Sequence, residues 1–203
     1  MEGATDETYA LEVAEHLGTK HIHYKVTSDE LLSSIREVIG EIGSYDTTTV
    51  RASVANYMVC KKIKESGESV YMFNGDGADE LMGGYLYFHE APNAQEFDVE
   101  CRRLLRDIHS FDVLRSDRSI GGNGLAPRTP YLDTEFVRAY LEVPAEIRWT
   151  AHRRCEKYLI RRGCTKKNYI PQSVLWRRKE AMSDGVSSET DSWHTILARY
   201  ADT

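Results

Sequence analysis

A short β-prone run that breaks into a glycine-rich acidic turn constrains the fold of this chain more than any other feature. Residues 69–73 (S-V-Y-M-F) favour a strand, and residues 74–80 (N-G-D-G-A-D-E) follow directly and lead into an apolar helical stretch. A strand that passes through a tight turn into a helix is the repeating unit of α/β folds. We therefore expect a helix-rich α/β domain with a few parallel strands and a ligand site at the open end of the sheet.

Apolar periodicity and turn residues predict the other elements. Residues 21–26 alternate between polar and apolar side chains and predict a further strand. Helices are expected where apolar residues recur every three to four positions, at residues 6–17, about 28–42, 49–64, 104–114, 134–141 and 157–162. The sequence contains no internal repeat and no low-complexity linker, so residues 1–203 are expected to form one domain.

Composition and the first residues bear on location. Hydrophobic residues make up 41% and charged residues 29% of the chain, as in ordinary soluble domains. No run approaches the roughly 18 to 20 apolar residues of a membrane span. The first 18 residues are acidic and amphipathic, unlike a signal or transit peptide. We therefore expect a cytoplasmic protein with no membrane partner.

Charge and cysteine spacing limit the partners. The formal charge of −6 argues against nucleic-acid binding, whereas the concentration of cations between residues 153 and 179 suits a local anionic ligand. The four cysteines form no C-x-x-C pair, and the seven histidines form no metalloprotease pattern. A zinc site is not predicted.

The turn itself is the best candidate for chemistry. Two glycines bracket Asp76, and the carboxylates of Asp76, Asp79 and Glu80 fall within five residues immediately before an apolar helical stretch. We expect residues 74–79 to form a loop at the C-terminal end of a strand. Exposed amides together with carboxylates suit a metal-bound phosphate, although a tight turn with an acidic helix cap explains the same residues. Gly83-Gly84 in the apolar stretch that follows weakens a helix and indicates a close approach of the backbone to another group.

The loop resembles the S-G-E-G-[AS]-D-E-x-x-G-G-Y signature of asparagine synthetases. Residues 86–94 (L-Y-F-H-E-A-P-N-A) continue the match almost letter for letter. Further matching segments occur in the same order at residues 45–53, 130–133, 156–161 and 176–186. The resemblance thus covers nearly the whole chain.

The resemblance implies a fold of the ATP-pyrophosphatase (adenine nucleotide alpha hydrolase-like) type and a two-step reaction. ATP, with Mg²⁺, would adenylate the side-chain carboxylate of aspartate, and ammonia would displace AMP to give asparagine. By analogy with the family, Arg51 and Lys157 would contact the pyrophosphate, Asp79 would hold magnesium, and Asp76 would serve the acyl-adenylate and ammonia steps. The analogy also assigns Asn74 and Gly75 to the binding of ATP or pyrophosphate. Thr48 and Arg115 are assigned to the same pocket on weaker matches.

The sequence also departs from the family. It contains no S-G-G-x-D-S pyrophosphate loop and no N-terminal glutaminase cysteine. The sequence therefore predicts a synthetase domain truncated at its N-terminus. A longer product, or a separate chain, would have to supply the pyrophosphate loop and the glutaminase. In the signature, Asp76 replaces Glu and Asn74 replaces Ser, and Ala126 stands where the family has an acidic residue two positions before Arg128.

Three functions follow from these patterns. The first is an asparagine synthetase present as a partial domain. The second is a catalytically degenerate domain that acts as a binding or assembly component. The third is a relative of β-lactam synthetase, which keeps the adenylation chemistry but changes the acceptor. The match at residues 86–94 favours asparagine synthetase over the third.

Overall fold

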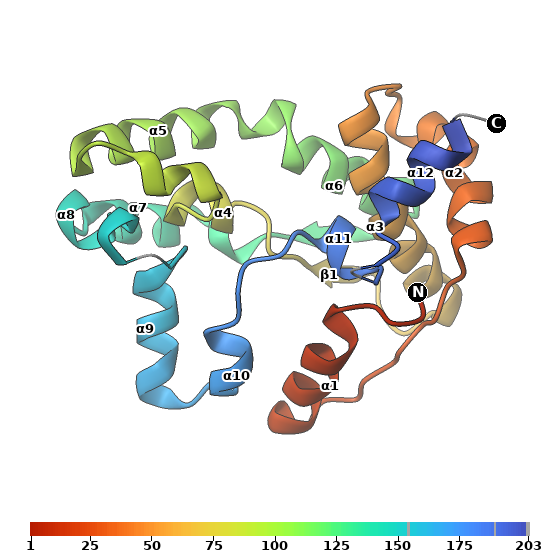
Figure 1. Ribbon diagram of the computed structural model, residues 1–203, viewed down its shortest axis with the longest axis horizontal. Coiled ribbons are helices and arrows are strands. Elements are labelled where there is room, and N and C mark those ends of the chain that lie inside the picture. The colour runs from red at the N-terminus through yellow and green to blue at the C-terminus, as the bar shows by residue number, and fades with distance from the viewer. Residues whose placement is uncertain (154, 189, 202–203) are drawn as a thin grey trace. The chain divides into compact units, whose positions relative to one another are not determined.

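The computed structural model describes residues 1–153, 155–188 and 190–201 (Figure 1). Helices dominate the described residues, and two short strands form the sheet. The α-helices are α1 (Asp6–Leu17), α2 (Ser28–Ile42), α3 (Thr47–Ser66), α4 (Ala78–Met82), α5 (Ala94–Asp107), α6 (Asp112–Gly122), α7 (Thr134–Glu142), α8 (Ala145–Arg148), α9 (Tyr158–Lys167), α10 (Gln172–Leu175), α11 (Met182–Gly185) and α12 (Trp193–Ala201). The strands are β1 (Tyr71–Phe73) and β2 (Ala126–Arg128), and the 3-10 helices are η1 (Leu86–Glu90), η2 (Ile108–Ser110), η3 (Pro130–Leu132) and η4 (Ala151–Arg153).

The chain divides into two compact units, each built from separated segments. The first unit comprises Met1–Val70, Arg115–Ala126 and Asn168–Thr203, and the second comprises Tyr71–Leu114 and Pro127–Lys167. Among the described residues, no helix is both long and apolar enough to cross a membrane.

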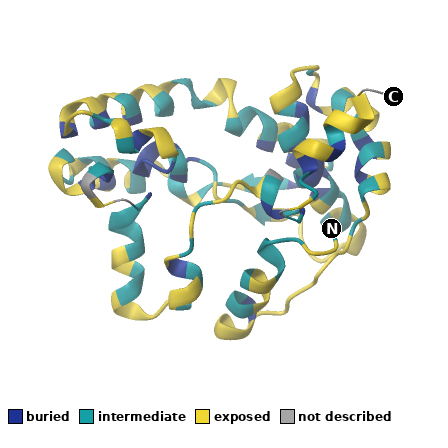
Figure 2. Ribbon diagram, in the orientation of Figure 1, coloured by how far each residue is buried: buried dark blue, intermediate teal, exposed yellow. Residues whose placement is uncertain are grey.

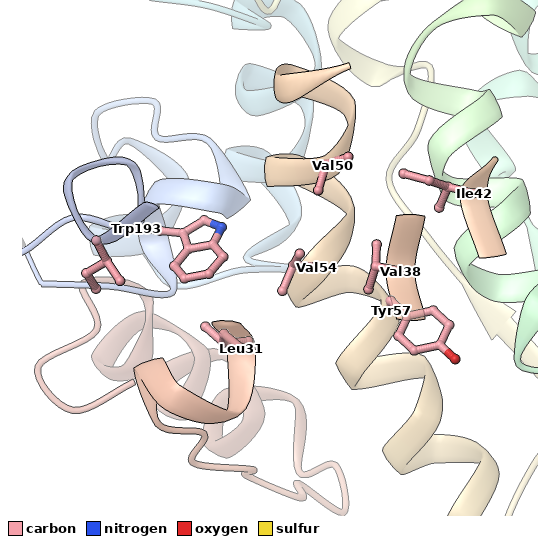
Figure 3. Packing of buried hydrophobic residues seen from close by; sticks show 8 residues of the cluster. Leu31, Val38, Ile42, Val50, Val54, Tyr57 and Trp193 are labelled. Carbon is pink, nitrogen blue, oxygen red and sulfur yellow. The ribbon is translucent and has the colours of Figure 1, made fainter. Parts of the chain in front are cut away.

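The core of the first unit lies between α2, α3 and α12. Figure 3 shows its apolar side chains, which are Leu31, Val38, Ile42, Val50, Val54, Tyr57, Trp193 and Ile196. Local signals define α2, because Thr27 Oγ1 accepts from the Glu30 N–H at 3.2 Å and the Glu30 carboxylate accepts from the Thr27 N–H at 2.7 Å. Helix α2 ends at Gly43, whose φ of +61° favours glycine.

The second unit places α4 against α7. Leu81 and Met82 of α4 are buried with Tyr140 of α7. Most of α4 is coloured as buried in Figure 2. A neighbouring cluster contains Phe88, Phe97 and Cys101. These contacts fix the short helix that follows the glycine-rich turn.

Strands β1 and β2 form a two-stranded parallel sheet. The Ala126 N–H donates to the Val70 carbonyl at 2.7 Å, and the Asn74 N–H donates to the Arg128 carbonyl at 3.0 Å, so both strands run in the same direction. The prediction of a helix-rich α/β architecture with parallel strands is confirmed. The apolar side chains of Tyr71 and Phe73 are exposed, although a strand inside a parallel sheet is ordinarily covered on both faces.

Two of the predicted elements are wrong. Residues 21–26 form no strand, and the side chains of Ile22 and Tyr24 are exposed, because no neighbouring strand pairs with them in the described sheet. The helix predicted at residues 104–114 is interrupted, since α5 ends at Asp107 and α6 begins at Asp112 after a turn of 3-10 helix. Apolar spacing continues across this break and conceals it in the sequence.

Candidate functional site

The turn after β1 is shaped by its own side chains and by glycine. Asn74 Oδ1 accepts a hydrogen bond from the Asp76 N–H at 3.2 Å, which closes a local side-chain turn. Gly77 has a φ of +84°, and a Cβ there would lie 2.3 Å from Leu132 Cδ2. Glycine is therefore required at position 77 both by backbone conformation and by space.

Asp79 lies in the first turn of α4 and not in the loop. The prediction of a loop from Asn74 to Asp79 is therefore wrong at its end, because α4 already begins at Ala78. The side chains of Asp76 and Asp79 are both half-buried. An acidic residue at a helix N-terminus is also stabilised by the helix dipole.

The glycine pair after α4 allows the backbone to pass close to Asp79. Gly83 ends the helix with a φ of +64°, and the Gly84 N–H donates to the Asp79 carbonyl at 2.8 Å. A Cβ at Gly84 would lie 1.9 Å from Asp79 Oδ1. The close approach predicted from Gly83-Gly84 is confirmed, and the group approached is the Asp79 carboxylate.

The structure brings Asp79 and Lys157 together across 78 positions of sequence. Lys157 Nζ lies 3.3 Å from both Asp79 Oδ1 and Asp79 Oδ2, and both side chains are about a quarter exposed. Lys157 has a φ of +55°, a conformation that few residues other than glycine adopt. A carboxylate and an ammonium thus meet directly beside the glycine-rich turn.

Glu80 anchors the other side of α4. Tyr85 Oη lies 2.6 Å from Glu80 Oε1 and 3.1 Å from Asp112 Oδ2. Burial raises the pKa of Glu80 above its ordinary value, against the hydrogen bond from Tyr85, and the charge of Asp112 raises it further. The residue after Asp79 is therefore held inside the fold, while Asp79 stays accessible.

The other predicted site residues lie in the first unit, near the start of α3. Asp46 caps α3 by accepting from the Thr49 N–H at 2.7 Å. Hydrogen bonds from Thr49 hold the pKa of Asp46 below its usual range, and the charge of Arg115 and the backbone of Thr48 add to this effect. Thr48 and Arg115 thus both interact with the Asp46 carboxylate, Thr48 through its backbone and Arg115 through its charge.

Arg51, one turn further along α3, is paired within the first unit. Its guanidinium lies 3.3 Å from Asp184 Oδ1, and its carbonyl accepts from the Trp193 indole N–H at 3.1 Å. Asp184 belongs to the matched segment at residues 176–186, which supplied no role from sequence alone. Since Arg51 and Lys157 lie in different units, their predicted convergence on one pocket stays a prediction.

The donor set fits magnesium only in company with phosphate. Among residues 1–153, 155–188 and 190–201, no group of three or more His, Cys, Asp or Glu side chains could hold a metal ion. Magnesium in nucleotide sites is commonly held by one or two carboxylates, with phosphate oxygens and waters completing the octahedron. Asp79 meets that limited requirement.

Comparison with known proteins decides the family. The family model described as asparagine synthase matches residues 1–98 and 90–202. The chain belongs to the asparagine synthase family. It is 44% identical over 202 residues to the glutamine-hydrolyzing asparagine synthetase of Gallus gallus and 43% identical to that of Homo sapiens. The match covers 100% of this chain and 36% of each relative, so the chain spans about a third of the length of these asparagine synthetases.

One departure from the asparagine synthase pattern has a visible accommodation. Ala126 has no carboxylate to offer Arg128. The Arg128 guanidinium instead lies 4.5 Å from the centre of the Tyr71 ring, and its Nη1 donates to the Pro127 carbonyl at 2.9 Å. A cation over an aromatic face is stabilised without a counter-ion, so the exposed arginine tolerates the loss of the acidic residue.

Proposed function

We propose that this chain forms part of a synthetase centre that converts aspartate to asparagine by way of a β-aspartyl-AMP intermediate. The contact between Asp79 and Lys157 beside the glycine-rich turn carries the proposal. Attack of a carboxylate on the α-phosphate of ATP joins two anions, so the centre needs cations that offset their repulsion and fix the line of attack. The pair supplies one cation and one metal-binding carboxylate at the same place.

The two side chains have complementary roles in this proposal. Asp79 would hold magnesium, which would supply positive charge against the phosphates. Lys157 would contact the pyrophosphate oxygens with its ammonium group. Gly75 would offer its backbone amide to phosphate and Asn74 its side-chain amide, because the Asn74 backbone N–H already donates to the Arg128 carbonyl. Asp76 would act in the acyl-adenylate and ammonia steps. Thr48, Arg51 and Arg115 are proposed as further phosphate contacts by analogy with the family.

The exposed strand supports the participation of further polypeptide. Tyr71 is 55% and Phe73 74% exposed, which is unusual for a parallel strand next to a candidate ligand site. We propose an ATP-pyrophosphatase type of fold, in the cytoplasm, in which another segment or a separate chain supplies the S-G-G-x-D-S loop. The same polypeptide would supply the glutaminase.

A catalytically degenerate binding or assembly component is the second candidate. Asp76 has one methylene fewer than the glutamate of the family signature, and a retraction of about 1 Å matters in a preorganised site. The absence of an acidic side chain at Ala126 also favours a domain without catalytic activity. This candidate keeps the fold and the Asp79–Lys157 pair but has no turnover.

Binding of magnesium pyrophosphate and magnesium ATP tests the proposal. We expect calorimetry at millimolar ligand to detect weak binding to the chain, and a Lys157→Met variant to bind at least about tenfold more weakly because a charged partner of the phosphate is lost. Lys167→Met is the matched control, since Lys167 is exposed in the last turn of α9 and has no assigned role. Equal binding by both variants would remove Lys157 from the phosphate site, and no binding by the wild-type chain would favour the second candidate.

A further inference from the structure

A partly buried hydrogen bond joins two residues that the proposed chemistry does not use. His89, on η1, has its Nε2 atom 2.9 Å from Glu156 Oε1, across 67 positions of sequence. Glu156 is 8% exposed. Burial opposes ionisation of Glu156, but the hydrogen bond from His89, with the Glu156 backbone and the charges of His89 and Arg161, outweighs burial and lowers the pKa of Glu156. The pair therefore presents an ionised carboxylate inside the second unit.

Glu156 is held at two points. Its carboxylate is held by His89, and its backbone carbonyl accepts from Arg161 Nε at 2.9 Å. The next residue, Lys157, directly precedes α9, and its carbonyl accepts from the Arg161 N–H at 3.2 Å. The peptide that joins Glu156 to Lys157 thus has little freedom to rotate.

The fixed peptide coincides with a strained backbone. Lys157 has a φ of +55°, and a left-handed conformation costs a residue other than glycine about 1 to 3 kcal/mol. Such strain persists only where surrounding contacts enforce it. The enforced conformation directs Lys157 Nζ to within 3.3 Å of both oxygens of Asp79. If the contact between His89 and Glu156 served stability alone, it would not require a left-handed backbone at Lys157, the residue after Glu156.

We propose that His89 and Glu156 are positioning residues that hold Lys157 against Asp79. His89 fixes the Glu156 carboxylate, Glu156 fixes the peptide before Lys157, and the Lys157 side chain thereby starts from a backbone position that presents it to Asp79. The catalytic consequence rests on the proposed function, because it requires Lys157 to act on phosphate. The positioning itself does not.

Nuclear magnetic resonance of the chain with ¹³C-dimethylated lysines tests the positioning directly. A Lys157→Arg variant identifies the Lys157 signal, and an Asp79→Asn variant gives the position of that signal when the ion pair is absent. His89→Gln places an amide N–H where His89 Nε2 lies, whereas His89→Asn does not reach that position. We expect the Lys157 signal to keep its wild-type position in His89→Gln and to move toward the Asp79→Asn position in His89→Asn.

Two further variants make the test decisive. Tyr87→Phe is the matched control, because it removes a hydrogen bond of 2.8 Å to Glu100 from the same 3-10 helix and is expected to leave the Lys157 signal unchanged. Glu156→Gln keeps the shape of the side chain and removes its charge, so it should move the signal part of the way and serves as the test if His89→Asn does not fold. An unchanged Lys157 signal in folded His89→Asn or Glu156→Gln overturns the proposal.

Pyrophosphate binding is measured on the same variants. If the proposed function holds, affinity should fall by about tenfold in His89→Asn and remain near wild type in His89→Gln and Tyr87→Phe. If the wild-type chain binds no pyrophosphate, the proposed function fails. The lysine signal then still decides whether His89 and Glu156 position Lys157.

Discussion

Glycine at position 84 sets how closely the backbone passes the Asp79 carboxylate. A Cβ at this position would lie 1.9 Å from Asp79 Oδ1 and 2.7 Å from the Asp79 Cα, so both the side chain and the helix would have to shift. We expect Gly84→Ala to lower the free energy of unfolding by about 1 to 3 kcal/mol, as overpacking commonly does. Urea unfolding followed by circular dichroism measures this change. The displaced carboxylate should also release Lys157.

Gly163→Ala is the control for this substitution. Gly163 lies within α9, and apart from its chain neighbours and the helix's own backbone no atom lies within 4 Å of a Cβ built there. Alanine is a better helix former than glycine by about 1 kcal/mol, so stability should stay unchanged or rise. A Gly84→Ala protein as stable as wild type would show that α4 adapts without cost.

At the level of single residues, sequence reasoning found Asp79 and Lys157 but not the residues that support them. The resemblance assigned Asp79 to magnesium and Lys157 to pyrophosphate, and the structure brings the two side chains into contact. His89 and Glu156 stood inside matched segments, yet nothing in their spacing joined them, because a tertiary hydrogen bond over 67 positions leaves no periodic signal. The left-handed conformation of Lys157 was equally invisible, since only glycine or asparagine would have indicated it.

At the level of elements, a buried ion pair joins α5 to α8. Arg148 is 2% exposed and is hydrogen-bonded to Asp98, while its Nε donates to the Val143 carbonyl at 2.8 Å. We expect Asp98→Asn to destabilise the second unit by about 2 to 4 kcal/mol, because it leaves a buried guanidinium without its counter-charge. Arg102→Gln removes the other, exposed partner of Asp98 and should cost less than about 1 kcal/mol. Similar losses in both variants would contradict the importance of burial here.

The same pair predicts a pH dependence. Burial opposes ionisation of Asp98, but hydrogen bonds from Arg102 and Arg148 outweigh it, and the pKa of Asp98 is lowered in the folded state. A group with a lowered folded pKa contributes stability above its unfolded pKa, about 3.9 for Asp, and loses it as the pH falls through the folded pKa. The difference in unfolding free energy between wild type and Asp98→Asn should therefore be full at pH 7 and shrink below about pH 4. Urea unfolding at several pH values measures it, and a constant difference would contradict the assignment.

Elements with strong local signals were predictable, and elements that depend on distant partners were not. Helix α2 has a capping box and a terminal glycine, and its predicted and observed extents agree. In residues 21–26 the only signal was the alternation of polar and apolar side chains. Alternation indicates that one face of an extended segment is apolar, but it does not provide the neighbouring strand that a sheet requires. The break between α5 and α6 was not visible in the sequence, because apolar residues continue at helical spacing across it.

At the scale of the whole molecule, each unit depends on residues far apart in the chain. Trp193 and Ile196 complete a core whose other buried members lie between residues 31 and 57, and Lys157 contacts Asp79 of α4 across 78 positions of sequence. The sequence predicted one domain, and the interleaved segments of the two units were not visible in it. Contacts of this range are decided by packing and leave no pattern along the chain.

The last prediction concerns turnover by the purified 203-residue chain. We expect it to make no detectable asparagine from aspartate, ATP and ammonia, and to bind nucleotide weakly. In the family the S-G-G-x-D-S loop supplies backbone amides to pyrophosphate, and the 203 residues contain no such run, so several phosphate oxygens are left to water or to Arg51 and Lys157. Loss of one preorganised donor costs about 10² to 10³ in rate, and here several donors are absent while Asp76 replaces the signature glutamate.

Release of pyrophosphate and formation of asparagine, with ammonia supplied directly, are the measurements, because added ammonia removes any need for a glutaminase. An intact asparagine synthetase assayed in parallel sets the detection limit. Adding a polypeptide that carries the S-G-G-x-D-S segment of a relative should restore some turnover if the exposed face of β1 receives that segment, and Lys157→Met should abolish whatever is restored. Robust turnover by the chain alone would require that its own residues form another phosphate-binding loop. The amides of Gly75 and Gly77 are the candidates for that loop, because these residues flank Asp76 in the turn after β1, whereas the N–H groups of Asn74 and Asp76 are already hydrogen-bonded.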